Sequence, residues 1–135
     1  MTMFKVLRRN EDGAAALEFA IALPVLMMMI IGIFQVGLLF EANAGMQHAL
    51  GEGARLATLC VPSGSTCTAP SDTTVKTRIS ARLFGKNDGT FTVADPAAGA
   101  GFKTLSVSYT RTMHFLFITG PTVTLTRSKK VYTVS

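Results

Sequence analysis

The sequence predicts an α+β fold: a long N-terminal transmembrane helix continues into a small exported domain with a second helix and an antiparallel β-hairpin or small sheet. Three observations predict this fold. Residues 14–40 are nearly all apolar, residues 72–84 carry apolar side chains at four-residue steps, and residues 104–110 and 122–126 alternate polar with apolar side chains. A chain of 135 residues has room for one membrane span and one small domain.

The apolar stretch divides the chain into a leader (1–13), a transmembrane or assembly helix (14–40) and an exported domain (41–135). A helix of about 20 apolar residues is long enough to span a bilayer. Glu41 follows the stretch, and three basic residues precede it: Lys5, Arg8 and Arg9. The positive-inside rule therefore predicts a single-pass protein whose N-terminus is cytoplasmic and whose C-terminal domain is exported.

We expect the helix to begin near Ala14 and to continue beyond the membrane to about Leu59. Pro24 removes one backbone hydrogen bond, which predicts a kink or local melting inside the membrane rather than an end. Glu18 lies within the apolar stretch, where a carboxylate costs a few kcal/mol on insertion scales. Such a carboxylate requires either a partner or a function.

Residues 8–40, RRNEDGAAALEFAIALPVLMMMIIGIFQVGLLF, resemble the N-terminus of type IVb pilin-like proteins, and most closely the TadE-like minor pilins of the tight-adherence pilus. In that family a membrane-embedded prepilin peptidase cuts after the glycine, and a glutamate followed by an aromatic residue stands at position five of the mature chain. The resemblance implies a cut between Gly13 and Ala14, with Glu18 and Phe19 acting in assembly. It continues through a second motif, Glu52-Gly53-Ala54-Arg55, and more weakly through residues 105–111 and 122–128.

The resemblance implies a minor pilin-like subunit, or pseudopilin, of the inner membrane that takes part in assembly, priming or capping of a type IVb pilus used in adhesion. Its implied partners are the prepilin peptidase, the major pilin, sibling minor pilins, the inner-membrane assembly platform and membrane lipid. Cleavage would create an ammonium group on Ala14 that can lie beside the Glu18 carboxylate of a neighbouring subunit. Breaking such a buried pair costs about 3–5 kcal/mol, so Glu18 would set the depth at which subunits dock.

Two other interpretations of the N-terminus remain open. The first is a secretory signal peptide cut after Ala42-Asn43-Ala44, which fits the A-x-A pattern but has a far longer apolar region than the roughly 7–15 residues of a signal peptide. The second is an uncleaved anchor that carries a periplasmic binding or adhesion domain without a pilus role. Both interpretations leave Gly13 and Glu18 without a purpose.

The two cysteines, Cys60 and Cys67, are separated by VPSGST. In an oxidising exported compartment this spacing predicts a disulfide, which would contribute about 2–3 kcal/mol. We expect no metal and no cofactor, because the two histidines, His48 and His114, show no ligand spacing. We expect no enzymatic activity either, since no nucleophile, base and orienting group are placed together in the sequence.

Small residues recur every fourth position after the membrane, at Gly45, Ala49, Gly53 and Ala57. This spacing allows close helix packing, either with a neighbouring subunit or with the chain's own sheet, and we favour the sheet. Glu52 and Arg55 are three residues apart and can form an ion pair worth a few tenths of a kcal/mol.

The second helix is predicted from Asp72 to Phe84, with Ser71 as its N-cap and Gly85 as its terminator. A short strand follows around Phe91 and Val93, and residues 94–101 are expected to form a loop. The two alternating segments are expected to pair as an antiparallel hairpin.

The apolar run at residues 113–118 has two interpretations. It can belong to the core, which we favour, or it can form an apolar loop that touches the membrane or another subunit. The formal net charge is +5, and basic residues outnumber aspartates in the exported region. We interpret them as a solvated face, and nucleic acid is not expected as a partner because aromatic residues do not interleave with the charges.

Overall fold

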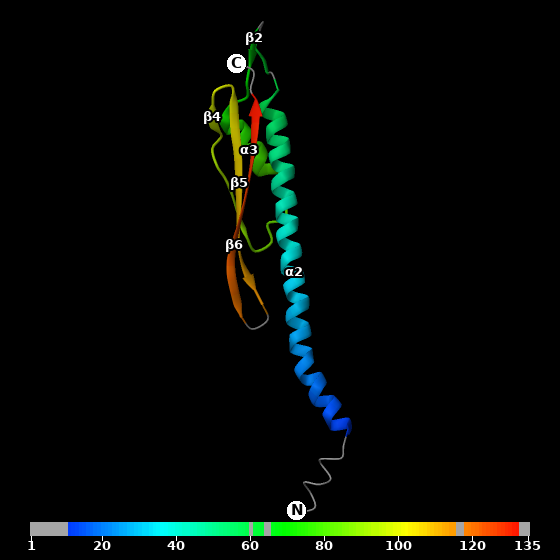
Figure 1. Ribbon diagram of the computed structural model, residues 1–135. Helices are drawn as coiled ribbons and strands as arrows, with labels where there is room; N and C mark the ends of the chain where they lie inside the picture. Colours follow the sequence, from blue (N-terminus) through cyan, green and yellow to red (C-terminus); the bar gives the residue numbers. More distant parts are fainter. Residues whose placement is uncertain (1–10, 60, 64–65, 116–117, 133–135) are drawn as a thin grey trace, which may run out of the picture.

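The computed structural model describes residues 11–59, 61–63, 66–115 and 118–132. They form a long helix, a shorter helix and antiparallel strands, which confirms the predicted α+β fold. The long helix α2 (Glu11–Ala57) runs most of the length of the molecule, and the shorter helix and the longest strands lie beside its C-terminal part (Figure 1). The other part of α2 therefore projects from the domain.

Helix α2 spans Glu11–Ala57 and is continuous through Pro24. It begins slightly before the expected Ala14 and ends slightly before the expected Leu59. The predicted local melting at Pro24 does not occur, although the blue end of α2 is inclined to the rest of the helix in Figure 1. An apolar helix tolerates one proline because the lost hydrogen bond is a local defect in a long ladder.

Helix α3 spans Asp72–Arg82, and its N-cap is the predicted Ser71, whose hydroxyl oxygen accepts a hydrogen bond from the backbone N–H of Thr74 at 3.2 Å. The helix ends two residues earlier than predicted, because Leu83 already has an extended backbone conformation. Gly85 then has a φ of +75°, a left-handed conformation that favours glycine.

The main sheet has β5 (Phe102–His114) at its centre. β6 (Thr119–Tyr132) runs along one edge of β5, while β3 (Thr90–Val93) and β4 (Ala97–Gly99) pair with its other edge. All pairs are antiparallel, so the predicted hairpin is confirmed. β4 corrects the expectation that residues 94–101 form a loop, because β5 is long enough to pair with a second short strand beyond β3. A separate small hairpin joins β1 (Val61–Ser63) to β2 (Thr66–Thr68).

The core lies between the C-terminal part of α2, α3 and the main sheet. Alternate residues of β5 point into it, and Leu105, Val107 and Tyr109 are fully buried or nearly so. From α3 come Val75 and Ile79, at the predicted four-residue spacing. The contribution of α2 begins at Ala42 and continues through Ala57. The domain is thus built against the second half of α2.

The preference for residues 113–118 as core is wrong. Met113 and Phe115 are half-buried, Ile118 is 63% exposed, and these residues lie at the end of the β5–β6 hairpin. Residues 116 and 117 lie outside the described part of the chain. The physical reason is length: the hairpin is longer than the core, which the β5 residues up to Tyr109 already fill, so its end extends past the domain along α2 (Figure 1).

Candidate assembly and membrane-anchoring helix

The N-terminal half of α2 is a bare apolar surface. Every residue from Gly13 to Ile30 is exposed, and the large side chains include Leu17, Phe19 and Ile21. By length and composition, α2 between Gly13 and Ala57 can cross a membrane. Only 6% of its most apolar 18-residue stretch is buried within the molecule. A core helix of a soluble domain would be mostly buried, so this helix suits a single-pass membrane anchor.

The predicted processing and assembly residues lie in the first turns of this bare segment. Gly13, Ala14, Glu18 and Phe19 are all exposed. A Cβ atom added at Gly13 would meet nothing within 4 Å, and its φ is not in the left-handed region, so the fold itself does not require glycine there. Ala14 and Glu18 are one helical turn apart and lie on the same face of α2.

Glu18 lies at one end of a shallow apolar groove on the surface of α2 that also includes Ile21, Val25 and Met29. Among the described residues, no ion pair involves its carboxylate: the three pairs found are Lys76–Asp95, Lys103–Asp72 and Arg111–Asp88. Burying such an unpaired carboxylate in lipid or in a filament would be costly, so it requires a partner from outside the described chain.

The predicted face of small residues is buried, and the chain's own segments occupy the space beside it. Gly45, Ala49, Gly53 and Ala57 all lie against the domain. A Cβ atom at Gly45 would overlap the carbonyl oxygen of Phe84, and one at Gly53 would overlap the side chain of Ile79. The closest neighbours of the two glycines are therefore α3 and the segment that follows it, and not the sheet that the spacing was expected to face.

The Glu52-Gly53-Ala54-Arg55 motif has two sides. Gly53 and Ala54 are buried in the helix contact, whereas Arg55 is exposed and Glu52 is partly exposed. The predicted Glu52–Arg55 ion pair is not among the pairs that the described residues form. Its small expected energy does not compensate the side-chain entropy that pairing would cost. Both residues, together with Arg78 of α3, line a shallow depression on the domain.

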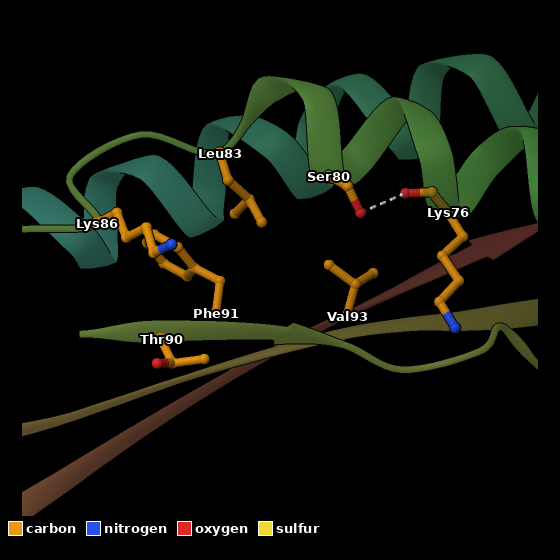
Figure 2. Close-up of a pocket in the computed structure, with 7 residues that line it drawn as sticks. All are labelled: Lys76, Ser80, Leu83, Lys86, Thr90, Phe91 and Val93. Atoms are coloured by element: carbon orange, nitrogen blue, oxygen red, sulfur yellow. Dashed lines mark hydrogen bonds between the residues drawn. The ribbon is translucent and has the colours of Figure 1, made fainter.

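Figure 2 shows an open pocket between α3 and β3, far along the chain from Glu18. Phe91 and Val93 point from β3 toward α3, and Lys76 lies at the rim with its amine 2.6 Å from Asp95. The hydroxyl of Ser80 donates to the backbone carbonyl of Lys76 at 3.0 Å, which is an ordinary contact within a helix. The described residues that line the pocket include no His, Asp or Glu side chain.

Among the described residues, the histidines and cysteines do not form a metal site. The ring of His48 lies 5.9 Å from the ring of Phe84 and is tilted against it by 58°, and His114 lies at the far end of β5. Within the described residues there is no group of three or more His, Cys, Asp or Glu side chains that could hold a metal ion. Cys60 lies outside the described residues, so the disulfide with Cys67 stays a prediction.

A set of polar contacts near Glu41 was missed by the sequence analysis. We call it the polar collar, and its members are Glu41, Asn43, Asn87, Asp88, Arg111 and Arg127. Asn87 donates to the Glu41 carboxylate at 3.2 Å, and Arg127 donates to the side-chain oxygen of Asn43 at 2.7 Å. Arg111 is 3% exposed and lies 3.7 Å from the Asp88 carboxylate. These contacts join residues up to 84 positions apart, and no local pattern reveals them.

Gln35 was missed as well, although the sequence carries a signal for it. It is the one side chain between Glu18 and Glu41 that is not apolar or glycine. Its side chain is buried, and its amide nitrogen donates to the backbone carbonyl of His114 at 2.7 Å. A lone polar residue in an apolar helix marks a place where that helix meets another element.

The architecture is an exposed apolar helix that can cross a membrane, with a small α+β domain beside its second half. Residues 13–55 match the model of a family described as TadE-like protein. Over these residues the chain is therefore similar to TadE-like proteins, which confirms the predicted resemblance along α2. The weaker resemblance predicted for residues 105–111 and 122–128 lies outside the match. The comparisons with curated proteins and with solved structures gave no match.

Proposed function

We propose that this protein is a minor pilin-like subunit, or pseudopilin, that takes part in assembly, priming or capping of a tight-adherence type IVb pilus. In this proposal it is not an enzyme but the substrate of a prepilin peptidase, which cuts between Gly13 and Ala14. The single observation that carries the proposal is the exposed Glu18 on a bare apolar helix, which forms no ion pair with the described residues and lies within the segment that matches the TadE-like family.

The chemistry of assembly follows from Ala14 and Glu18. Cleavage leaves an ammonium group on Ala14, one helical turn from the Glu18 carboxylate, and no other described element covers either residue. A neighbouring subunit can therefore approach with its own amine or carboxylate. In an apolar environment each charge stabilises the other, and a misplaced subunit leaves a buried charge unpaired at a cost of about 3–5 kcal/mol.

The cleavage site is also accessible. A protease binds an extended segment, so the first turn of α2 must unwind around Gly13. That turn makes no contact with the domain, and glycine lowers helix stability by about 1 kcal/mol relative to alanine. Local unwinding is therefore inexpensive at this end of α2.

The same structure disfavours a secreted domain cut after Ala44. Such a cut would remove Ala42, which is fully buried in the core, and Gln35, which is hydrogen-bonded to the hairpin. A signal peptide that is discarded has no reason to be part of the folded domain. The proposed location is the inner membrane with the N-terminus cytoplasmic, and the proposed partners are the peptidase, the major pilin, sibling minor pilins and the assembly platform.

The test replaces one carboxylate with its uncharged isostere in a strain that makes the pilus. Glu18→Gln is expected to abolish piliation while the protein stays in the membrane fraction, because the amine then loses its partner. Glu41→Gln removes the same charge from the same helix outside the apolar segment and is expected to leave piliation intact. Electron microscopy and membrane fractionation measure the two outcomes. Normal piliation with Glu18→Gln would favour a simple anchor without an assembly role.

A further inference from the structure

The end of the β5–β6 hairpin lies beside the part of α2 that the proposed function places in lipid. We propose that Met113, Phe115 and Ile118, the apolar residues described at this end, insert into the leaflet nearest the domain and contact phospholipid acyl chains. The protein would then be held in the membrane by two elements. This inference rests on the membrane anchoring of α2 but not on any role in a pilus.

The contacts between the hairpin and α2 fix its position. The side-chain amide of Gln35 donates to the carbonyl of His114 at 2.7 Å. The ring of Phe115 lies 3.7 Å from where a Cβ atom at Gly32 would be, and 2.7 Å from where one at Gly120 would be. Phe115 is therefore seated between a glycine of α2 and a glycine of β6, and the hairpin end rests against residues 32–35.

The depth of this contact follows from helix geometry. Glu41 is the first charged residue of α2 after Glu18, so it marks the edge of the apolar layer. At 1.5 Å per residue, Gln35 lies about 9 Å and Gly32 about 14 Å below Glu41 along the helix axis. Half of the hydrocarbon core of a bilayer is about 15 Å thick. The hairpin end therefore lies within one leaflet if Glu41 lies at its surface.

The distribution of charge on the hairpin matches that of α2. Residues 112–126 contain no Asp, Glu, Lys or Arg, just as residues 19–40 of α2 contain none. The flanking residues, Arg111 and Arg127, belong to the polar collar, which also holds Glu41. The charged parts of the hairpin and of the helix thus meet at one level, and their charge-free parts extend from that level in the same direction (Figure 1).

The backbone of the hairpin end is suited to an environment without water, where unpaired polar groups are costly. Phe115 and Ile118 exchange backbone hydrogen bonds of 2.9 and 3.3 Å, and the carbonyl of His114 is paired with Gln35. Nearer the domain, the hydroxyls of Thr112 and Thr122 form a hydrogen bond of 2.9 Å. The exposed side chain of Ile118 is unfavourable in water but favourable in lipid.

The test uses the absence of tryptophan from the sequence. Phe115→Trp places one fluorophore at the packed position between the two glycines. Ile118→Trp places one at an exposed position where packing is not disturbed. Phe34→Trp is the positive control, because Phe34 precedes Gln35 on α2 and is 64% exposed at the same depth. Tyr132→Trp, at the opposite end of β6 with 76% exposure, is the aqueous control. Each full-length variant is reconstituted at low density into phosphatidylcholine vesicles with or without brominated acyl chains.

We expect bromolipid to quench Phe115→Trp and Ile118→Trp about as strongly as Phe34→Trp, with blue-shifted emission and protection from acrylamide. Tyr132→Trp should show the opposite pattern. Quenching of Phe34→Trp alone would overturn this inference and leave the anchoring of α2 intact. Protection of the hairpin variants from both quenchers would overturn it too, since another protein surface would then cover the hairpin. Absence of quenching in Phe34→Trp would contradict the proposed anchoring as well.

Discussion

The two halves of α2 belong to one continuous helix but have opposite surroundings. From Gly13 to Ile30 every residue is exposed, and from Leu17 onward most side chains are large and apolar. From Ala42 to Ala57 the helix has a buried stripe, and most members of that stripe are alanine or glycine. The comparison teaches that hydrophobicity alone does not show where a helix packs within its own chain. Small side chains at regular spacing mark the half that the domain approaches closely.

The largest expected contrast compares Ile→Ala at two sites, one packed against the second half of α2 and one within its first half. Ile79→Ala empties a buried site on α3 that faces the second half of α2, and such changes cost about 2–5 kcal/mol. Ile30→Ala removes the same atoms from the bare half, where the side chain is 52% exposed, and should change domain stability by less than about 0.5 kcal/mol. Chemical unfolding in detergent micelles measures both values. Equal losses would contradict the division of α2 into two halves.

A second contrast compares two glycines of the same helix. Gly45→Ala should destabilise the domain by about 1–3 kcal/mol, because the new methyl group meets backbone atoms of Phe84 that cannot move like a side-chain end. Gly37→Ala meets nothing within 4 Å and should preserve or raise helix stability by up to about 1 kcal/mol. The same unfolding experiment applies. A harmless Gly45→Ala would show that the helix and the segment after α3 are not in close contact.

The smallest expected effect is the contribution of the buried Tyr109 to the pH dependence of domain stability. Burial raises the pKa of Tyr109, whose hydroxyl donates to the carbonyl of Lys86 at 3.0 Å. Since an unfolded tyrosine titrates near about pH 10, the unfolded state loses its proton first. The stabilising effect of Tyr109 is thus complete below that pH and is lost as pH rises toward the folded pKa.

Tyr109→Phe should remove this loss of stability at alkaline pH and cost about 1 kcal/mol at neutral pH, because one hydrogen bond disappears. Tyr132→Phe is the control, because Tyr132 is exposed and should leave the alkaline decline unchanged. Unfolding free energies measured at a series of alkaline pH values give both slopes. Identical slopes in the wild type and Tyr109→Phe would show that another group causes the decline.

Local patterns predicted α2, α3, β3, β5 and β6, but not β1, β2, β4 or the contacts between distant segments. The alternation of polar and apolar side chains predicted β5 and β6, and Ser71 predicted the start of α3. Strand faces and helix caps depend on residues that are close together in the sequence. The sequence could not show that Phe84 would meet Gly45, or that Gln35 would meet His114, 79 residues away. The apolar run at residues 113–118 was assigned to the core because hydrophobicity does not distinguish a core from a membrane-facing surface.

The account depends most on a peptidase cut that frees the amine of Ala14 at the exposed end of α2. The most direct test is the N-terminal residue of the protein recovered from cells with intact processing, measured by mass spectrometry of the N-terminal peptide. The account predicts that this residue is Ala14. Recovery of a chain that begins at Met1, or at Gly45 after a signal-peptidase cut, would contradict it.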